Sequence, residues 1–238
     1  MSCWLAGCWL LRSSLSRFSS FAGETRLYIL RVVSRLGLAQ ARAALLLLLT
    51  LRGIPTMYSG DEIGMHDVPI PAEQARDPFR IIAPGVRRNR DPARTPMQWD
   101  SSLNAGCCLP TVEPWLPLPT DSKQTNVAAQ RENPHSMLTL IHALLALRRT
   151  TPALNSGSYR PVESGHVDRF VYWRQFGHQR RLTVMNCPSQ EQTVRLAETG
   201  SGQLSISTFL DREEPIELTT LHLRGNEGCI IALTDTME

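Results

Sequence analysis

The sequence lacks the cysteine and histidine spacings that build a metal site. None of its six cysteines forms a C-x-x-C pair, and none lies at zinc-site spacing from a histidine. We therefore expect neither a metal nor another cofactor. Cysteines scattered along a 238-residue chain are typical of free thiols in a reducing compartment, which predicts a cytoplasmic location. They are Cys3, Cys8, Cys107, Cys108, Cys187 and Cys229.

A hydrophobic run long enough to span a bilayer is also missing. Residues 43–51 (AALLLLLTL) are purely uncharged, but a transmembrane helix needs about 20 apolar residues. Arg42 and Arg52 flank this run, so we interpret it as a buried helix of a globular domain. Residues 1–21 contain no acid and faintly resemble an organellar presequence, but their positive charge follows the apolar stretch. We expect no membrane partner.

A strong excess of one charge is absent as well. The net charge is +3, and residues 1–42 hold six arginines against one acid, so the remainder is slightly acidic. This distribution leaves no basic face for nucleic acid. We interpret the arginines of residues 1–42 as a solvated or accidental N-terminus. No Ser-His-Asp grouping, phosphate loop or glycine-rich dinucleotide turn is present in the sequence.

The first two thirds of the chain have the rhythm of an α/β fold. An Ala/Leu-rich run predicts a helix over 38–52, and IPTMY at 54–58 predicts a buried parallel strand. A long irregular stretch, 59–133, follows. A helix is predicted over 137–150, with Arg148 and Arg149 placed favourably at its negative C-terminal end.

The last third changes to a period of two, which predicts strands separated by turn residues. We expect a small antiparallel sheet or sandwich that begins after a boundary at 155–165. The candidate strands are 167–176, 181–186, 192–197, 203–210, 216–223 and 228–234.

Residues 89–100 (NRDPARTPMQWD) gather arginine forks, carboxylates and an indole in one loop that two prolines stiffen. Arginine holds carboxylates and hydroxyl groups at fixed angles, and a tryptophan face can stack on a sugar ring. These residue types predict a sugar-binding loop. The candidate substrate-binding residues are Arg90, Asp91, Arg94 and Trp99.

A purely structural alternative exists for part of this loop. Arg94, Trp99 and Asp100 could serve only to lock the loop to the rest of the domain, and we favour that interpretation for these three. For Arg90 we favour substrate binding.

The stretch RDPARTPMQWD resembles the loop after strand eight in the alpha-glucosidases and oligo-1,6-glucosidases of the alpha-amylase superfamily (glycoside hydrolase family 13). GIPTMYSGDEIGM at 53–65 resembles their eighth barrel strand and its exit, and ALLALRRTTPAL resembles their last barrel helix. The β-rich end resembles their C-terminal domain. The resemblance runs from about residue 36 to residue 233, and RTPMQWD in this setting is highly specific.

The resemblance implies a (β/α)8 barrel and a retaining mechanism with two carboxylates on strands four and five. It also implies an Asn-His-Asp at the end of strand seven. This sequence has RLYILRVV at 26–33 instead, and no Asn-His-Asp anywhere. By the same resemblance Arg90 would hold the terminal glucose of an alpha-glucoside or malto-oligosaccharide, if the barrel were complete. We expect no catalytic residue in the chain.

Adjacent Asp61 and Glu62 cannot readily replace the two carboxylates, because an extended backbone points neighbours apart. We expect them to close the strand end and hold its loop.

The expected architecture is α/β plus all-β: a C-terminal remnant of a (β/α)8 barrel over 35–155, then an antiparallel β-sandwich over 156–238. Residues 1–34 are unmatched, and out-of-frame translation, a targeting leader or a fusion would each explain them; we prefer the first. The alternative function is a non-catalytic β-sandwich module for binding or assembly.

Overall fold

A computed structural model describes most of the chain, and its residues separate into two compact units. The described residues are 27–29, 37–78, 82, 90–166, 168–196 and 200–233. We name the two units the sheet unit and the loop unit. The sheet unit comprises Met1–Leu27, Leu46–Pro55 and Ala146–Glu238, and the loop unit comprises Tyr28–Leu45 and Thr56–Leu145.

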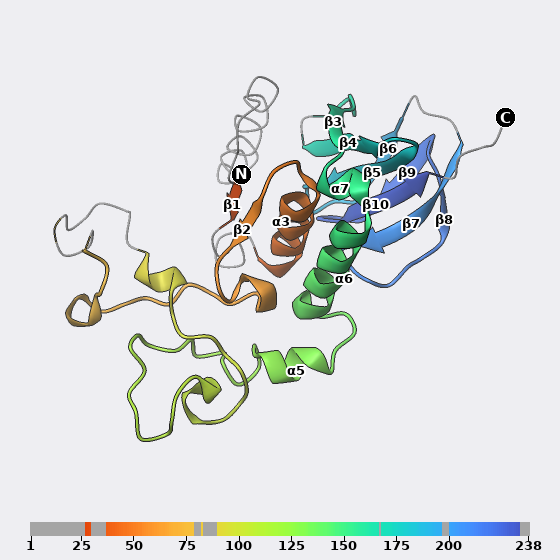
Figure 1. Ribbon diagram of the computed structural model, residues 1–238. Coiled ribbons are helices and arrows are strands. Elements are labelled where there is room, and N and C mark those ends of the chain that lie inside the picture. Colours follow the sequence, from red (N-terminus) through yellow and green to blue (C-terminus); the bar gives the residue numbers. More distant parts are fainter. Residues whose placement is uncertain are drawn as a thin grey trace. The chain divides into compact units, whose positions relative to one another are not determined.

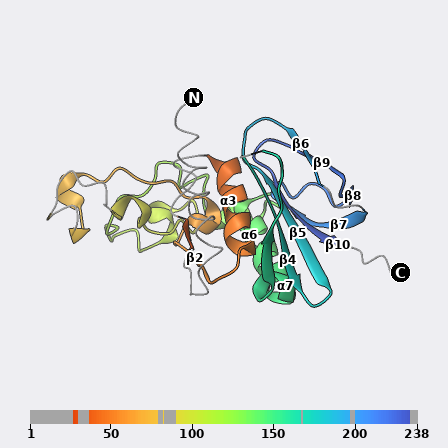
Figure 2. The ribbon, with the colours of Figure 1, turned by 90° about the horizontal axis from the view of Figure 1, so that it is seen from above.

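The sheet unit is built on a six-stranded antiparallel sheet in the order β3-β4-β5-β10-β7-β8. Figure 2 shows its central strands side by side. A two-stranded antiparallel sheet, β6-β9, completes the unit. The bounds are β3 Ser158–Pro161, β4 Arg169–Phe176, β5 Gln179–Asn186, β6 Gln192–Arg195, β7 Ser201–Ser207, β8 Pro215–Glu217, β9 Thr220–Leu223 and β10 Gly228–Leu233. The predicted antiparallel β region is confirmed.

Both sheets contribute side chains to one hydrophobic core. Trp173 and Ile231 from the large sheet and Val194 and Leu221 from the small sheet belong to the same buried cluster. In β9, Leu221 and Leu223 are buried and alternate with exposed neighbours, because successive side chains of a strand point to opposite faces. Strands β4 and β10 instead carry runs of four buried residues. Burial of this apolar surface is the main stabilising contribution to the unit.

Two details of the strand prediction are wrong. The predicted strand 216–223 is two strands, since β8 pairs with β7 while β9 pairs with β6. The apolar residues on either side of the break, Leu218 and Leu221, lie three positions apart, so a period of two cannot continue across it. Strand β3, which pairs with β4, was not predicted.

Helix α3 (Leu38–Thr50) confirms the predicted buried helix, and its leucines 45–49 are almost completely inaccessible. The carbonyl groups at its C-terminal end are satisfied by two arginines of the sheet unit. Arg148 donates from Nη1 to the carbonyls of Leu49 (2.7 Å) and Leu51 (3.1 Å), and Arg174 Nη1 donates to the carbonyl of Thr50. Helix α3 therefore ends on guanidinium donors rather than on solvent.

Helix α6 (Met137–Thr150) has the predicted bounds. Ser136 Oγ accepts a hydrogen bond from the backbone N–H of Thr139 at 3.0 Å and so caps its first turn. Arg148 and Arg149 lie in its last turn, as predicted, and the Arg148 guanidinium also donates to the carbonyls at the end of α3. The short helix α7 (Pro152–Asn155) follows (Figure 1).

Strand β2 (Pro55–Met57) confirms the predicted strand but not its burial. All three residues are only half-buried, and the preceding Ile54 is 65% exposed. Its neighbour in a two-stranded sheet is β1 (Leu27–Ile29). Apart from β1, the segment 1–34 lies outside the described residues.

Arg42 corrects the interpretation of the N-terminal arginines. It is 6% exposed, and its Nη1 donates to the carbonyl oxygen of His135 at 2.9 Å. The interpretation as a solvated residue is therefore wrong for Arg42. The other five arginines of residues 1–42 lie outside the described residues.

In its described residues the long stretch 59–133 carries only short helical turns, which agrees with its predicted irregularity. They are η1 (Asp61–Ile63), η2 (Ala72–Gln74), η3 (Asp91–Ala93), η4 (Leu103–Gly106) and α5 (Val127–Arg131). Val68, Ile70 and Leu116 form a small core within it. Across the described parts of both units, every helix is too short or too polar to cross a bilayer.

Candidate functional site

The site predicted from the sequence lies in the loop unit, where the chain leaves β2. The side chain of Asp61 accepts a hydrogen bond from the Tyr58 N–H at 3.0 Å, and that of Glu62 accepts one from the Gly60 N–H at 2.7 Å. Gly60 permits this tight turn because its φ of 97° is open to glycine at little cost. The prediction that Asp61 and Glu62 hold the strand exit is confirmed.

Arg90 is held in place by a buried carboxylate, that of Asp77. Arg90 Nε lies 3.0 Å from Asp77 Oδ2 and Arg90 Nη2 lies 2.9 Å from Asp77 Oδ1, a bidentate pair. The Arg90 backbone N–H also donates to Asp77 Oδ2 at 2.7 Å. The Asp77 side chain is completely buried while that of Arg90 is 41% exposed. Hydrogen bonding to Asp77 raises the pKa of Arg90, so its charge is secure.

Asp91 makes the reverse connection. Its carboxylate is buried, and its Oδ2 accepts hydrogen bonds from the backbone N–H groups of Arg76 (2.8 Å) and Asp77 (2.9 Å). The two Arg-Asp-Pro sequences, 76–78 and 90–92, therefore hold each other. The carboxylate of Asp77 binds Arg90 of the second sequence, and the carboxylate of Asp91 binds the backbone of the first. We call this arrangement of Asp77, Arg90 and Asp91 the carboxylate clasp.

The clasp gives Arg90 and Asp91 different positions relative to solvent. Arg90 is fixed at its Nε and Nη2, and its side chain is still 41% exposed. Asp91 is 2% exposed and is used by the backbone of the loop. Sequence reasoning missed Asp77, although the repeated Arg-Asp-Pro was a signal that could have identified it.

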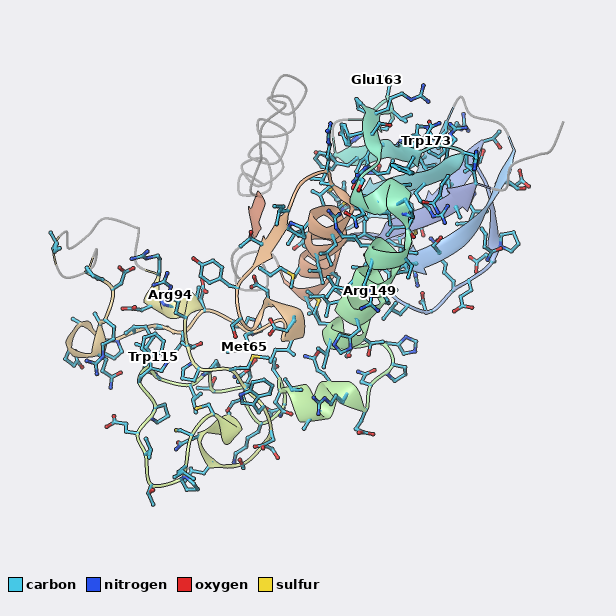
Figure 3. All side chains as sticks on the ribbon, viewed as in Figure 1. Met65, Arg94, Trp115, Arg149, Glu163 and Trp173 are labelled. Carbon is cyan, nitrogen blue, oxygen red and sulfur yellow. The ribbon has the colours of Figure 1, made fainter. Side chains whose placement is uncertain are left out.

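Arg94 and Trp99 are both exposed, and Figure 3 shows Arg94 on the loop. The Trp99 side chain is 50% exposed, whereas its backbone is tied on both sides: its N–H donates to the Ala105 carbonyl (2.8 Å) and its carbonyl accepts from the Ala128 N–H (2.9 Å). Trp99 thus offers an aromatic surface from a rigid backbone.

Asp100 shapes the same loop. It accepts hydrogen bonds from the Ser102 hydroxyl (2.5 Å) and the Ser102 N–H (2.8 Å), and these bonds lower the pKa of Asp100. This contact supports the loop-shaping interpretation for Asp100.

His66, a histidine of the loop unit, pairs with a carboxylate, that of Asp121. His66 Nδ1 lies 3.2 Å from Asp121 Oδ2, and both side chains are partly exposed, 49% and 34%. A pair in this position is an ordinary surface interaction of small energetic consequence.

The described cysteines are free thiols, as predicted. The half-buried Cys107 and Cys108 have their sulfur atoms 3.8 Å apart and are not bonded, and Cys187 and Cys229 are also free. Cys3 and Cys8 lie outside the described residues. Among the residues that the structure describes, no group of three His, Cys, Asp or Glu side chains is arranged to hold a metal ion.

Comparison with known proteins shows that most of the chain matches one protein family. The profile of the family described as alpha amylase, catalytic domain, matches residues 15–157. The match therefore begins inside the segment 1–34 and not near residue 36, where the resemblance was expected to start.

The most similar curated proteins include two glucosidases. The oligo-1,6-glucosidase of Parageobacillus thermoglucosidasius is 29% identical over 225 residues, covering 83% of this chain and 40% of that enzyme. Maltase A1 of Drosophila melanogaster is 33% identical over 190 residues, covering 77% of this chain and 32% of that enzyme.

Solved structures agree with the sequence comparisons. The trehalulose synthase MutB from Pseudomonas mesoacidophila MX-45 matches with a TM-score of 0.77 and 26% identity, covering 91% of this chain and 44% of MutB. The chain thus spans less than half the length of each of these three relatives.

Proposed function

This chain belongs to the alpha-amylase family, and on that premise we propose that it is the C-terminal portion of an alpha-glucosidase-like glycoside hydrolase. Its substrates would be alpha-linked glucosides, including malto-oligosaccharides, because relatives carry the names oligo-1,6-glucosidase and maltase. Residues 35–155 would form the end of a (β/α)8 barrel and residues 156–238 a β-sandwich. The core shared by the two sheets supports the sandwich.

The observation that carries the proposal is the fixed, partly exposed guanidinium of Arg90. Asp77 holds two of its nitrogens in a bidentate pair, so the side chain cannot rotate freely. A preorganised donor of this kind binds a sugar hydroxyl at lower entropic cost than a mobile arginine. Trp99 would add an apolar face, while Asp91 and Arg94 would shape the loop. Asp91 is buried, so its contribution would be made through the clasp.

We propose that the chain does not hydrolyse glucosides alone. Retaining hydrolysis needs two carboxyl groups roughly 5–5.5 Å apart on either side of the bond. Four carboxylates of the described segment that follows β2 are used by the loop itself: Asp61 and Glu62 by backbone N–H groups, Asp77 by Arg90 and Asp91 by the backbone. The nucleophile and acid would come from the first part of the barrel.

Two measurements test this proposal. The purified chain should release no p-nitrophenol from p-nitrophenyl α-glucoside, and it should bind isomaltose weakly in ligand-observed NMR. Arg90→Ala should abolish the binding, while Arg149→Ala, an exposed arginine in the other unit, should leave it unchanged. Turnover that disappears in Asp61→Asn or Glu62→Gln would overturn the proposal.

The alternative is a non-catalytic module for binding or assembly centred on the sheet unit. Its support is that this unit has its own sheets and core. Absence of both turnover and sugar binding would favour this alternative. The four free thiols support a cytoplasmic location for either function.

A further inference from the structure

Cys107 and Cys108 are adjacent in the chain, and their thiol groups also meet in space. The Cys107 thiol donates to Cys108 Sγ at 3.8 Å, and the Cys108 thiol donates to the carbonyl oxygen of Val112 at 3.4 Å. Both cysteines are free and half-buried, so a small molecule can reach them from solvent. We call these two thiols the vicinal dithiol.

The two sulfur atoms of the vicinal dithiol are poorly placed to form a disulfide with each other. The peptide bond that joins the two residues is trans, because the described residues include no cis peptide bond. A trans peptide sets neighbouring Cα atoms about 3.8 Å apart, whereas disulfides usually join Cα atoms roughly 4.4–6.8 Å apart. The pair therefore remains available as two thiols that a single third atom can bridge.

The turn that carries the vicinal dithiol is held by Asn104. Its Nδ2 donates to the carbonyl oxygens of Leu109 (3.0 Å) and Val112 (2.8 Å), which follow the two cysteines in the sequence. Asn104 and Ala105 have φ angles of 60° and 51°, a region that residues other than glycine rarely adopt. A backbone fixed in this way presents both thiols together and lowers the entropic cost of binding them to one ligand.

The number of ligands in the turn disfavours a metal cation. A zinc ion takes four ligands, but no three His, Cys, Asp or Glu side chains of the described residues are arranged to hold a metal. A cation also requires deprotonated thiols. Burial, together with the hydrogen bond to Cys108, raises the pKa of the Cys107 thiol and so opposes its deprotonation.

A trivalent arsenic atom that already carries one organic group meets both conditions. It is thiophilic, it needs only two further bonds, and its oxide reacts with neutral thiols. Apolar side chains beside the vicinal dithiol suit an aryl group on the arsenic, since Leu109 is 69% exposed and Val112 is 48% exposed.

We propose that Cys107 and Cys108 form a binding site for monosubstituted trivalent arsenicals. Each sulfur atom forms one bond to the same arsenic atom. The two S–H protons pass to the oxygen of the arsenical, its bonds to arsenic break, and it leaves as water. Arsenic stays trivalent and both sulfur atoms keep their oxidation state, so no oxidant or reductant is required.

Phenylarsine oxide is the probe that tests this site. Cys3 and Cys8, which lie outside the described residues, are replaced by serine in every protein, so that the four described thiols remain. We expect the intact mass to show one phenylarsenic group per chain. The adduct should resist excess 2-mercaptoethanol, because two As–S bonds must break together, and dithiothreitol should remove it.

Serine variants locate the two sulfur atoms. Cys107→Ser and Cys108→Ser should each weaken binding of phenylarsine oxide at least tenfold, because one thiol forms only one bond to arsenic. Cys187→Ala is the matched control, since it removes a half-buried free thiol of the sheet unit and should leave the affinity unchanged.

A measurement without substitution at the site guards against variants that fail to fold. Phenylarsine oxide should protect Cys107 and Cys108 from alkylation by iodoacetamide, as read by peptide mass spectrometry, and should leave alkylation of Cys187 unchanged. Absence of this protection overturns the site, as does an adduct that 2-mercaptoethanol removes. Binding of zinc chloride that Cys107→Ser abolishes, without any arsenical adduct, would assign the pair to a cation instead.

The vicinal dithiol and the proposed function can fail separately. Neither cysteine belongs to the carboxylate clasp, so isomaltose binding that depends on Arg90 can be present or absent without changing the result with phenylarsine oxide.

Discussion

Arg90 and Asp77 form a bidentate ion pair across 13 positions of sequence, with the Arg90 side chain partly exposed and that of Asp77 completely buried. This difference in exposure gives the two residues different roles. The buried Asp77 carboxylate can bind only groups of the protein, whereas the partly exposed Arg90 side chain remains accessible to solvent. The return connection from Asp91 to the backbone of Arg76 and Asp77 makes the arrangement reciprocal. The clasp therefore positions an arginine more firmly than an isolated surface pair would.

Asp77→Asn should destabilise the loop unit. The substitution removes the negative charge and one acceptor from a buried site that receives three hydrogen bonds from Arg90. Unsatisfied buried donors cost about 1–3 kcal/mol, so the free energy of unfolding in urea should fall by that amount. Asp121→Asn, which affects only the exposed pair with His66, should change it by less than about 0.5 kcal/mol. Equal losses for the two variants would contradict the structural importance of the clasp.

Cys229 should make the protein sensitive to alkaline pH. Burial, reinforced by the nearby Glu227, raises the pKa of the Cys229 thiol to about 12. An unfolded thiol ionises near pH 8.5, so above that pH the unfolded state holds fewer protons than the folded state. The free energy of unfolding should therefore fall as the pH rises from about 8.5 towards 12.

Urea unfolding at several pH values measures this effect. The slope due to one group is at most about 1.4 kcal/mol per pH unit. Cys229→Ala should lose this component of the slope, whereas Cys187→Ala retains the buried thiol and should keep it. Identical slopes in all three proteins would show that Cys229 does not titrate in this way.

Gly157 should tolerate no side chain. A Cβ atom at this position would lie 2.3 Å from the carbonyl oxygen of Ala153 and 2.6 Å from that of Gln175, both backbone atoms. Forced overpacking costs about 1–3 kcal/mol, and Gly157→Ala should lower the unfolding free energy in that range. Ser156→Ala, at the exposed neighbouring position, should stay within about 0.5 kcal/mol. A wild-type stability for Gly157→Ala would mean that α7 and β4 separate without cost.

The sequence patterns predicted the elements whose signal is local. The Ala/Leu-rich run of α3 specifies a helix by its composition and length, and the stripe of α6 does so by its period; their bounds were predicted within two residues. The burial of β2 could not be predicted in the same way. Burial depends on what covers a strand, and IPTMY alone cannot show which neighbours the chain supplies.

The clasp illustrates what a local reading of the candidate site misses. Arg90, Asp91, Arg94 and Trp99 were proposed from one motif, but the partner that fixes Arg90 lies 13 residues upstream. The repeated Arg-Asp-Pro sequence marks Asp77 as a candidate, but the repeat alone does not say which residue Asp77 contacts. That its carboxylate pairs with Arg90 becomes clear once the backbone path is known.

Arg148→Ala should weaken the sheet unit, while the adjacent Arg149→Ala should not. The Arg148 side chain supplies three hydrogen bonds to the carbonyls of Leu49, Leu51 and Gly53 at the end of α3, whereas the Arg149 side chain is exposed and makes no hydrogen bond with the described residues. Loss of the donors should lower the unfolding free energy by about 1–3 kcal/mol. The two variants remove the same charge one position apart, so net charge cannot explain a difference between them. Equal stability in urea denaturation would show that solvent satisfies the end of α3 equally well.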